Sequence, residues 1–178
     1  EKKVLAQYYS SQINLLTGRA NEALQLAETV LKRKPILQRN EVYEAALLVK
    51  ARCIAFISGM DQAFAYIDEI KDRGRASDPW QMKMAVVDFV AEAKGDAGVD
   101  DIIARFGAAA GEKIVARMLM IKAERLLKSG SGTEALSLLT EKIEKEYPVT
   151  KEDPDLYPAF LVLKGDALYQ TGDYAGAV

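Results

Sequence analysis

The chain has 178 residues, of which 49% are hydrophobic and 28% are charged, and its 24 basic and 26 acidic residues give a formal net charge of −2. This composition suits a globular protein with a sizeable core, and the nearly balanced charge provides no electrostatic attraction to nucleic acid or to an anionic membrane. The absence of histidine excludes His-based acid–base catalysis and every metal site that contains histidine.

The first stretch, residues 4–35, is typical of two amphipathic helices separated by a break at Gly18. Ser11 in the first helix and Ala23 in the second are twelve residues apart, and such small side chains allow two antiparallel helices to approach closely. Pro35 is expected to stop the second helix, and the basic residues before it suit the negative end of the helix dipole.

The second stretch, residues 42–73, repeats this arrangement. Ala51 and Ala63 are again twelve residues apart, and Gly59 lies in the break. Cys53 is the single cysteine of the chain, and its apolar neighbours predict a small buried side chain. No apolar run here reaches the roughly 18 residues of a membrane span, because basic residues interrupt the best candidate.

The third stretch, residues 79–107, departs from the pattern. Asp78 is placed to cap a helix that Pro79 begins, since proline suits a first helical turn. A Gly-Asp break is expected at Gly95, followed by a short second helix. Asp100 occupies the place of the small residue in that helix, so close packing is not expected there.

A Gly/Ala-rich link, residues 107–111, leads to the fourth stretch, residues 112–147. Ala123 and Ala135 restore the twelve-residue interval. The break between the two expected helices holds two glycines and two candidate capping residues: Gly130, Gly132, Ser131 and Thr133. Two glycine-rich segments in this region look like phosphate-binding loops. The first has no Ser or Thr after its lysine, and the second is not preceded by a strand, so neither fits the motif.

The last stretch, residues 155–178, follows a link, residues 148–158, whose three prolines and four charged residues predict an exposed loop. An amphipathic helix is expected next, then a break at Gly172 and the start of a second helix. Gly165 and Ala177 keep the twelve-residue interval.

One set of residues in this last stretch resembles the second half of a tetratricopeptide repeat, with the run G-D-Y-x-x-A as its most specific part: Gly165, Leu168, Tyr169, Gly172, Asp173, Tyr174 and Ala177. Residues 4–35 resemble the same repeat over their whole length. The resemblance implies an all-α fold, a right-handed α-solenoid of about five antiparallel helix pairs in a single domain, residues 1–178, from a longer protein of bacterial type. Its units are residues 4–35, 42–73, 79–107, 112–147 and 155–178.

In this family the first helix of each pair lines a concave groove that commonly holds an extended peptide or a partner helix. Transfer of the family's groove positions selects twelve residues here: Tyr8, Gln12, Leu15, Leu48, Arg52, Phe56, Met120, Glu124, Lys128, Val162, Asp166 and Tyr169. Their mixture of aromatic, aliphatic and charged side chains suits an amphipathic partner. Arg52 and Phe56, one helical turn apart, are the strongest candidates for partner contact, because arginine and aromatic residues are enriched where binding energy concentrates.

The resemblance implies a non-catalytic scaffold that binds a protein or peptide and uses no cofactor or metal. Carboxylates adjacent in sequence, such as Asp100 and Asp101, point roughly 100° apart on a helix and form no convergent acid–base pair. Two alternatives stay open, namely self-association as a homo-oligomer and a ligand-binding regulatory domain. Nucleic acid and membrane insertion are not expected, and the compartment is left open between the cytoplasm and a periplasmic or membrane-anchored location.

Overall fold

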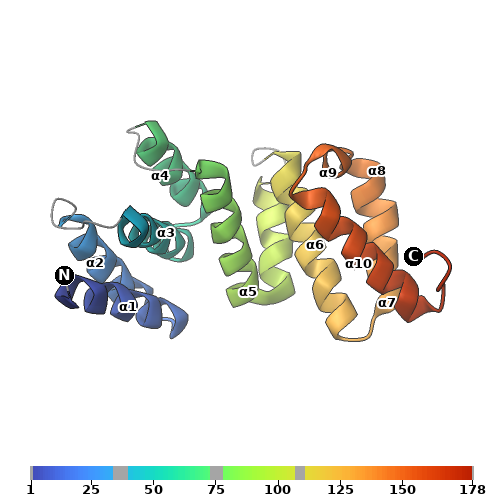
Figure 1. Ribbon diagram of the computed structural model, residues 1–178, viewed down its shortest axis with the longest axis horizontal. Coiled ribbons are helices and arrows are strands. Elements are labelled where there is room, and N and C mark those ends of the chain that lie inside the picture. Colours follow the sequence, from blue (N-terminus) through green and yellow to red (C-terminus); the bar gives the residue numbers. More distant parts are fainter. Residues whose placement is uncertain (1, 34–39, 73–77, 107–110, 178) are drawn as a thin grey trace. The chain divides into compact units, whose positions relative to one another are not determined.

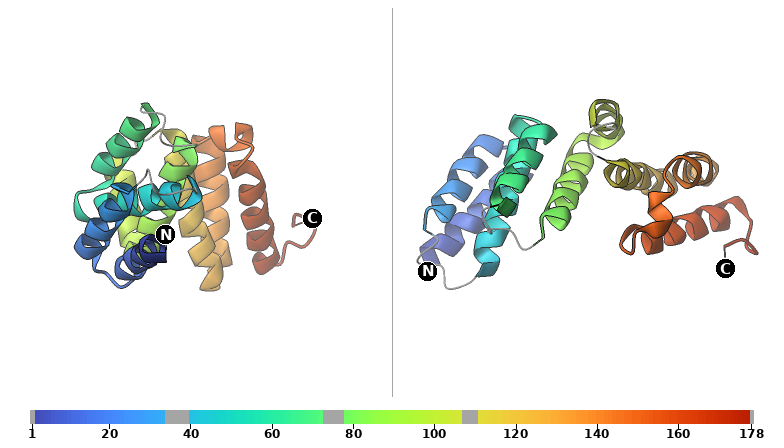
Figure 2. Two further views of the ribbon diagram at one scale, coloured as in Figure 1. Left: turned by 60° about the vertical axis from the view of Figure 1, so that its left-hand side comes forward. Right: turned by 90° about the horizontal axis from the view of Figure 1, so that it is seen from above.

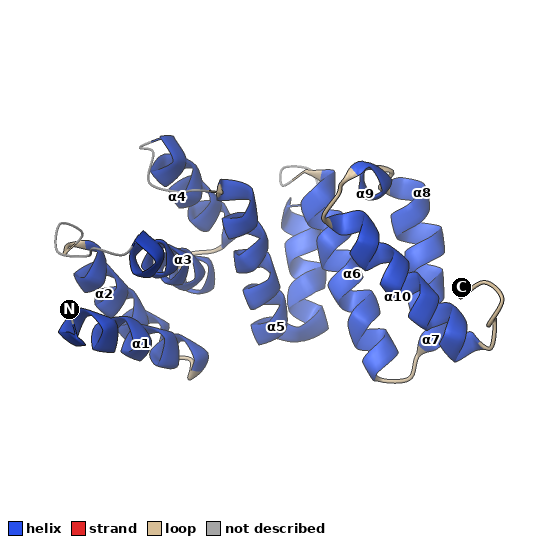
Figure 3. Cartoon of the chain, in the orientation of Figure 1, coloured by secondary structure: helices blue, strands red, loops and turns tan. Residues whose placement is uncertain are grey.

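The computed structural model describes residues 2–33, 40–72, 78–106 and 111–177. Every regular element within these ranges is helical and none is a strand, which confirms the predicted all-α class (Figure 1, Figure 3). The chain divides into two compact units, residues 1–90 and residues 91–178. No helix of the described part is both long enough and apolar enough to cross a membrane.

Unit 1 is built from helices that pack in chain order. Its described residues form α1 (Lys2–Leu16), α2 (Ala20–Leu31), α3 (Asn40–Ile57), α4 (Met60–Asp72) and the first part of α5 (Pro79–Phe106). The first helix packs against α2, α2 against α3, and α3 against α4 (Figure 2). The core beneath these contacts includes Val49 and Cys53 of α3, both fully buried.

Short turns that contain glycine connect the helices of each pair. The backbone at Gly18 has φ 79°, and the backbone at Gly59 has φ 101°. Glycine adopts this left-handed conformation at no steric cost, whereas other residues are strained there. Positive φ values also occur at the expected breaks Gly130 and Gly172, so these four sequence predictions are confirmed.

Most small residues of the twelve-residue interval are buried, whereas Gly165 and Ala177 are partly exposed. Ser11 and Ala23 are both inaccessible to solvent, and the Ser11 hydroxyl donates to the Tyr8 carbonyl at 2.6 Å, which satisfies it in the core. A Cβ atom built at Gly165 would lie 3.4 Å from the carbonyl oxygen of Ala177. Gly165 and Ala177 are therefore neighbours.

The long helix α5 is interrupted at the expected position. Gly95 has φ 68° and ψ −164°, which is not helical, so two helical segments meet there. At the start of α5 the Asp78 carboxylate accepts the backbone N–H of Gln81 at 3.0 Å, which confirms its predicted role as a cap.

Unit 2 surrounds one apolar cluster. Its described residues form the second part of α5, α6 (Glu112–Lys128), α7 (Gly132–Ser137), the π-helical segment η2 (Leu138–Ile143), α8 (Glu144–Glu146), α9 (Val149–Glu152) and α10 (Leu156–Thr171). Both α7 and α10 pack against α6. Phe160, with 1% of its surface exposed, is among the largest fully buried side chains of this cluster.

The segment η2 forms a wide turn inside an otherwise regular rod, residues 132–146. The backbone N–H of Glu144 donates to the carbonyl of Leu139, five residues earlier. The Thr140 hydroxyl donates to the Leu136 carbonyl at 2.8 Å and so competes with backbone N–H groups for that acceptor.

The prediction of an exposed loop over residues 148–158 is correct for the exposure of Lys151, Glu152 and Asp155 but wrong for the segment as a whole. This segment contains the short helix α9 and the first turn of α10, and Thr150 and Asp153 are buried. One Asp153 carboxylate oxygen accepts the backbone N–H groups of Asp155 and Leu156, at 2.9 and 3.0 Å. Pro158 is accommodated in the first turn of α10, where backbone N–H groups have no helical partner.

Three smaller expectations are also corrected. Gly132 belongs to α7 and is buried rather than part of an open break. Ser131 precedes α7, but no side chain caps that helix by a hydrogen bond. After Gly172 the described chain forms a single turn rather than a regular helix, in which the Asp173 carboxylate accepts the N–H of Gly176. Pro35 and residues 107–110, also named above, lie outside the described residues.

Candidate functional site

A cavity of about 580 Å³ opens between α6 and α10 in unit 2. We call it the α6–α10 groove. Both helices contribute lining residues: Arg117, Glu124, Leu127, Lys128, Ala159, Val162, Leu163, Asp166 and Gln170. The apolar cluster of unit 2 lies beneath the groove, because Leu127 belongs to that cluster and Ala159 and Leu163 pack against it.

Charged side chains surround the apolar floor of the α6–α10 groove. The Lys128 ammonium lies 2.7 Å from the Glu124 carboxylate, one turn away on α6. Such an exposed pair contributes no more than about 0.5 kcal/mol to stability, so both groups can exchange partners at little cost. Arg117 and Asp166 add one charge of each sign. The lining is therefore balanced in charge.

Exposed apolar side chains lie along the α10 side of the groove. Val162 is 64% exposed and lines the cavity. Tyr169, two turns further along α10, is 66% exposed, and its ring meets the ring of Tyr174 edge-on with centroids 5.2 Å apart. Val162, Asp166 and Tyr169 share one face of the helix. Large apolar side chains beside a groove are typical of binding surfaces.

The structure brings together most of the groove residues expected from the sequence of unit 2. Glu124, Lys128, Val162 and Asp166 all line the α6–α10 groove. Met120 does not, because it is 1% exposed and forms part of the core. The family's groove position at Met120 falls on the side of α6 that packs inward, so Met120 is corrected to a core residue.

Two polar residues of the α6–α10 groove were not selected from the sequence. Arg117 lies seven residues before Glu124, so helical periodicity places it on the same face and could have identified it. The Gln170 amide donates to the carbonyl of Leu127 at 3.1 Å and so ties α10 to α6. Gln170 follows Asp166 by one helical turn, so helical periodicity could have identified this residue as well.

A cavity of about 390 Å³ lies between α3 and α5 in unit 1 and is lined by Leu48, another predicted groove residue. One turn beyond Leu48, the Nε atom of Arg52 donates to the Ala85 carbonyl at 3.3 Å. Its guanidinium carbon lies 5.3 Å from the centre of the Phe89 ring. Arg52 therefore joins α3 to α5, while Phe56, the other preferred contact residue, is partly exposed.

The predicted groove residues of α1 form a hydrogen-bonded pair. The Gln12 amide donates to the Tyr8 hydroxyl at 2.5 Å. Burial and the neighbouring Tyr9 raise the pKa of Tyr8, and the positive charge of Arg52 and the bond from Gln12 partly offset that rise. Tyr8 is therefore within electrostatic reach of Arg52. Leu15 is buried in the core of unit 1.

Titratable groups with shifted pKa values have structural roles here. Burial raises the pKa of the Cys53 thiol to about 12, so it stays protonated and unreactive at neutral pH. Hydrogen bonds from Lys164 and Lys151 lower the pKa of Glu144 and join α8 and α9 to α10. No group of three or more metal-binding side chains occurs in the ranges that the structure describes.

Comparison of the chain with family models, with curated proteins and with solved structures found no match.

Proposed function

We propose that this protein is a tetratricopeptide-like interaction scaffold that binds a peptide or helix of a partner protein in the α6–α10 groove and performs no catalysis. The observation that carries the proposal is the groove itself, with its apolar floor and a lining of balanced charge. Amphipathic helices bind in this way, with their apolar face laid into a groove and their polar face in water.

The arrangement of helices supports the repeat interpretation. Pairs of helices joined at positive-φ glycines, with the last pair in contact at Gly165 and Ala177, fit a right-handed α-solenoid of about five antiparallel pairs. In that arrangement α3, α6, α10 and the first part of α5 are the first helices of successive pairs. The α3–α5 cavity and the α6–α10 groove then each lie between the first helices of two successive pairs.

The balanced charges favour a particular kind of partner. A strongly charged peptide gains nothing from a lining on which opposite charges already neutralise one another, whereas an amphipathic segment can bury apolar side chains on the floor and exchange ion pairs at the edge. Binding is therefore expected to depend weakly on salt, because burial of apolar surface rather than net charge supplies most of the affinity.

Two neighbouring residues of α10 provide the test. Val162 and Leu161 are both exposed apolar residues, but only Val162 lines the groove. Peptides selected on the protein from a displayed random library are titrated against the wild type, Val162→Glu and Leu161→Glu. We expect Val162→Glu to raise the Kd by about tenfold or more and Leu161→Glu to leave it unchanged.

The proposal is abandoned if the library yields no specific peptide, or if the two substitutions weaken binding equally. Unchanged thermal unfolding of both variants serves as the control for folding. Surface substitutions of this kind normally change stability by less than about 0.5 kcal/mol.

Self-association is a second candidate, favoured by one face of α1. Tyr9, Ile13 and Leu16 are exposed apolar residues at helical spacing. If this face binds a second copy, sedimentation should show a mass that increases with protein concentration, and Ile13→Glu should restore the monomer. A monomer at every concentration removes this candidate.

A further inference from the structure

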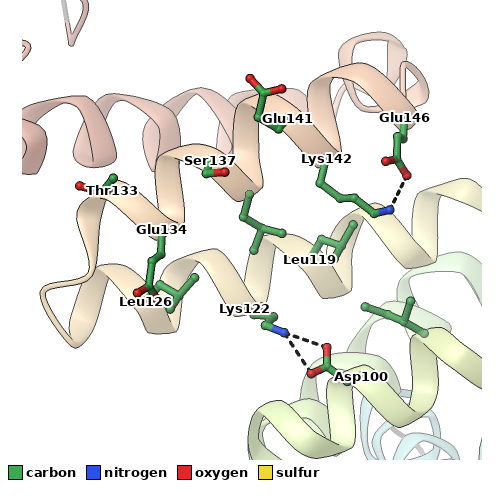
Figure 4. Close-up of a pocket in the computed structure, with 12 residues that line it drawn as sticks. Asp100, Leu119, Lys122, Leu126, Thr133, Glu134, Ser137, Glu141, Lys142 and Glu146 are labelled. Atoms are coloured by element: carbon green, nitrogen blue, oxygen red, sulfur yellow. Dashed lines mark hydrogen bonds and ion pairs between the residues drawn. The ribbon is translucent and has the colours of Figure 1, made fainter.

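A second and larger cavity, of about 770 Å³, lies in unit 2 between the C-terminal part of α5, helix α6 and the rod formed by α7, η2 and α8 (Figure 4). On α6 it is lined by Leu119, Lys122 and Leu126. At roughly 100° per residue these positions point away from Arg117 and Glu124, which line the α6–α10 groove. The two cavities therefore lie on opposite sides of α6. We call this one the acidic groove.

The floor of the acidic groove is apolar. Its aliphatic side chains are Ile103 of α5, Leu119 and Leu126 of α6, and Leu138 of η2. Three of them are only partly buried and pack with one side against the core of unit 2. Their other sides face a cavity rather than protein atoms, so apolar side chains of an occupant would gain burial there.

The lysines that line the acidic groove are already neutralised inside it. The Lys122 ammonium lies 2.9 Å from the Asp100 carboxylate, and the Lys142 ammonium lies 2.6 Å from the Glu146 carboxylate (Figure 4). Asp100 is the residue that replaces the expected small side chain in the third repeat unit. In the structure its carboxylate pairs with Lys122 of α6 at the wall of the acidic groove.

Two further carboxylates line the groove without a lysine partner inside it. Glu141 pairs only with Lys145, which does not line the cavity, and both side chains are largely exposed. Glu134 makes no ion pair with any residue of the described part. The groove therefore presents an apolar floor and a residual negative charge, which complements a partner that carries Lys or Arg beside an apolar ridge.

The dimensions suit a helix. The lining residues of the rod run from Thr133 to Glu146, which corresponds to a groove about 20 Å long at roughly 1.5 Å per residue. The π-helical segment η2 forms the middle of this wall through Leu138, Glu141 and Lys142. Wide turns of this type occur frequently at functional sites.

We propose that the acidic groove is a second docking site, which binds one amphipathic helix of a partner protein with an aliphatic ridge flanked by basic residues. Burial of the ridge on the apolar floor supplies affinity, and pairing of Lys or Arg with Glu134 and Glu141 sets the orientation. The site is separate from the α6–α10 groove, because it uses the opposite side of α6 and differs in charge.

A defined peptide library tests this proposal on the full chain. The library displays helical peptides of about 16 residues, with leucine at i, i+4, i+7 and i+11 and with Ala, Gln, Glu, Lys or Arg at the other positions. We expect the selected peptides to be basic. Their association rates should fall as salt is added, unlike those of α6–α10 groove ligands.

Two double variants make the same change in charge. Glu134→Gln with Glu141→Gln removes the two carboxylates that have no lysine partner inside the groove, whereas Glu152→Gln with Asp155→Asn removes two exposed carboxylates elsewhere in unit 2. The first variant should raise the Kd of the selected peptides by about five- to tenfold, and the second should leave it within about twofold. Ser137→Arg, which places a bulky cation at the exposed edge of the groove, should abolish binding.

Several results would overturn the proposal. These are failure to enrich any peptide, enrichment of acidic or neutral peptides, equal effects of the two double variants, or loss of binding in Val162→Glu. The last result would place the peptides in the α6–α10 groove instead. Thermal unfolding of each variant separates loss of binding from loss of folding.

Discussion

Unit 1 and unit 2 each have a cavity between two helices, but they use the charged side chains beside it differently. In unit 1, Arg52 is held by the Ala85 carbonyl and the Phe89 ring of α5. In unit 2, Glu124 of α6 lines the α6–α10 groove and, among the described residues, pairs with Lys128 on the same helix. A charged side chain beside a cavity is therefore tied to the facing helix when that helix offers it an acceptor or a ring, and otherwise stays at the surface of the cavity.

The cores beneath the two cavities differ in how deeply an aromatic side chain is buried. Phe160 is fully buried in the cluster of unit 2, so that core is closed by a large aromatic side chain. Phe89 of unit 1 is only partly buried and carries Arg52 on its face. In unit 2, by contrast, the helices are joined by this apolar cluster together with polar contacts such as Gln170 to the Leu127 carbonyl and Asp153 to Lys113.

The largest expected effect tests this contrast between the two aromatic residues. Phe160→Ala should lower the free energy of unfolding by about 3–5 kcal/mol, because it removes a fully buried ring and leaves a cavity. Phe89→Ala should cost about 1–2 kcal/mol, since the ring is only partly buried and loses mainly its contact with Arg52. Urea denaturation followed by circular dichroism measures both, and equal losses would remove the contrast.

Two glycines of unit 2 test how tightly its helices pack. A Cβ atom at Gly132 would lie 2.7 Å from Cβ of Gln170, so α7 and α10 would have to separate. Gly132→Ala should therefore lower the free energy of unfolding by about 1–3 kcal/mol. At Gly165 the nearest atom is 3.4 Å away, so Gly165→Ala should raise it by about 0.5–1 kcal/mol through its better helix propensity. A loss of stability in both variants would contradict this difference.

The aspartates that begin α5 and α10 provide the next comparison. Asp78 is partly exposed, whereas Asp153 is buried and lies 2.6 Å from the Lys113 ammonium. Asparagine also caps helices well, so Asp→Asn removes the charge and keeps the cap. Asp153→Asn should lower the free energy of unfolding by about 1–2 kcal/mol at neutral pH, and Asp78→Asn by less than about 0.5 kcal/mol.

The Asp153 effect should also depend on pH. Burial alone would raise the pKa of Asp153, but hydrogen bonds from Lys113 and from the backbone N–H groups of Leu156 and Asp155 outweigh it, and the net pKa is lowered. The unfolded chain therefore binds this proton more readily, and the stabilisation is complete above the unfolded pKa of about 3.9. It is lost as the pH falls through the lower folded pKa. A difference between wild type and Asp153→Asn that stayed constant down to acid pH would disprove this.

The smallest changes in the free energy of unfolding are expected for the charged residues beside the two cavities, Arg52 in unit 1 and Lys128 in unit 2. Arg52→Gln should lower the free energy of unfolding by about 1 kcal/mol, because the guanidinium bonds to α5 and covers the Phe89 ring. Lys128→Gln should change it by less than about 0.5 kcal/mol, since its ion pair with Glu124 is exposed. Thermal unfolding of the two variants measures both changes. A larger loss of stability for Lys128→Gln than for Arg52→Gln would contradict the comparison.

Local rules predicted much of the fold from the sequence. Glycine at Gly18, Gly59 and Gly172 marked the breaks because a positive φ is costly for other residues. The placement of Asp78 before Pro79 predicted the start of α5 for an equally local reason. Four residues taken from the groove positions of the resembled family, Glu124, Lys128, Val162 and Asp166, line the α6–α10 groove.

Features that depend on distant contacts were not predicted. The acceptor of Arg52 is the carbonyl of Ala85, which no local pattern identifies. Prolines and charges made residues 148–158 look like an exposed loop, but the ion pair between Asp153 and Lys113 of α6 anchors this segment in the core. Met120 was placed on the wrong face because the family's groove positions were transferred without knowledge of how α6 is rotated in its own unit.

Helix α6 forms a wall shared by the two grooves of unit 2, because its opposite faces line them. A displacement of α6 that widens one groove narrows the other, so partners bound on the two sides would compete through the helix without touching. Such antagonism is reciprocal by thermodynamic necessity, since each ligand must weaken the other by the same factor. A single rigid helix would then act as the switch between two assemblies.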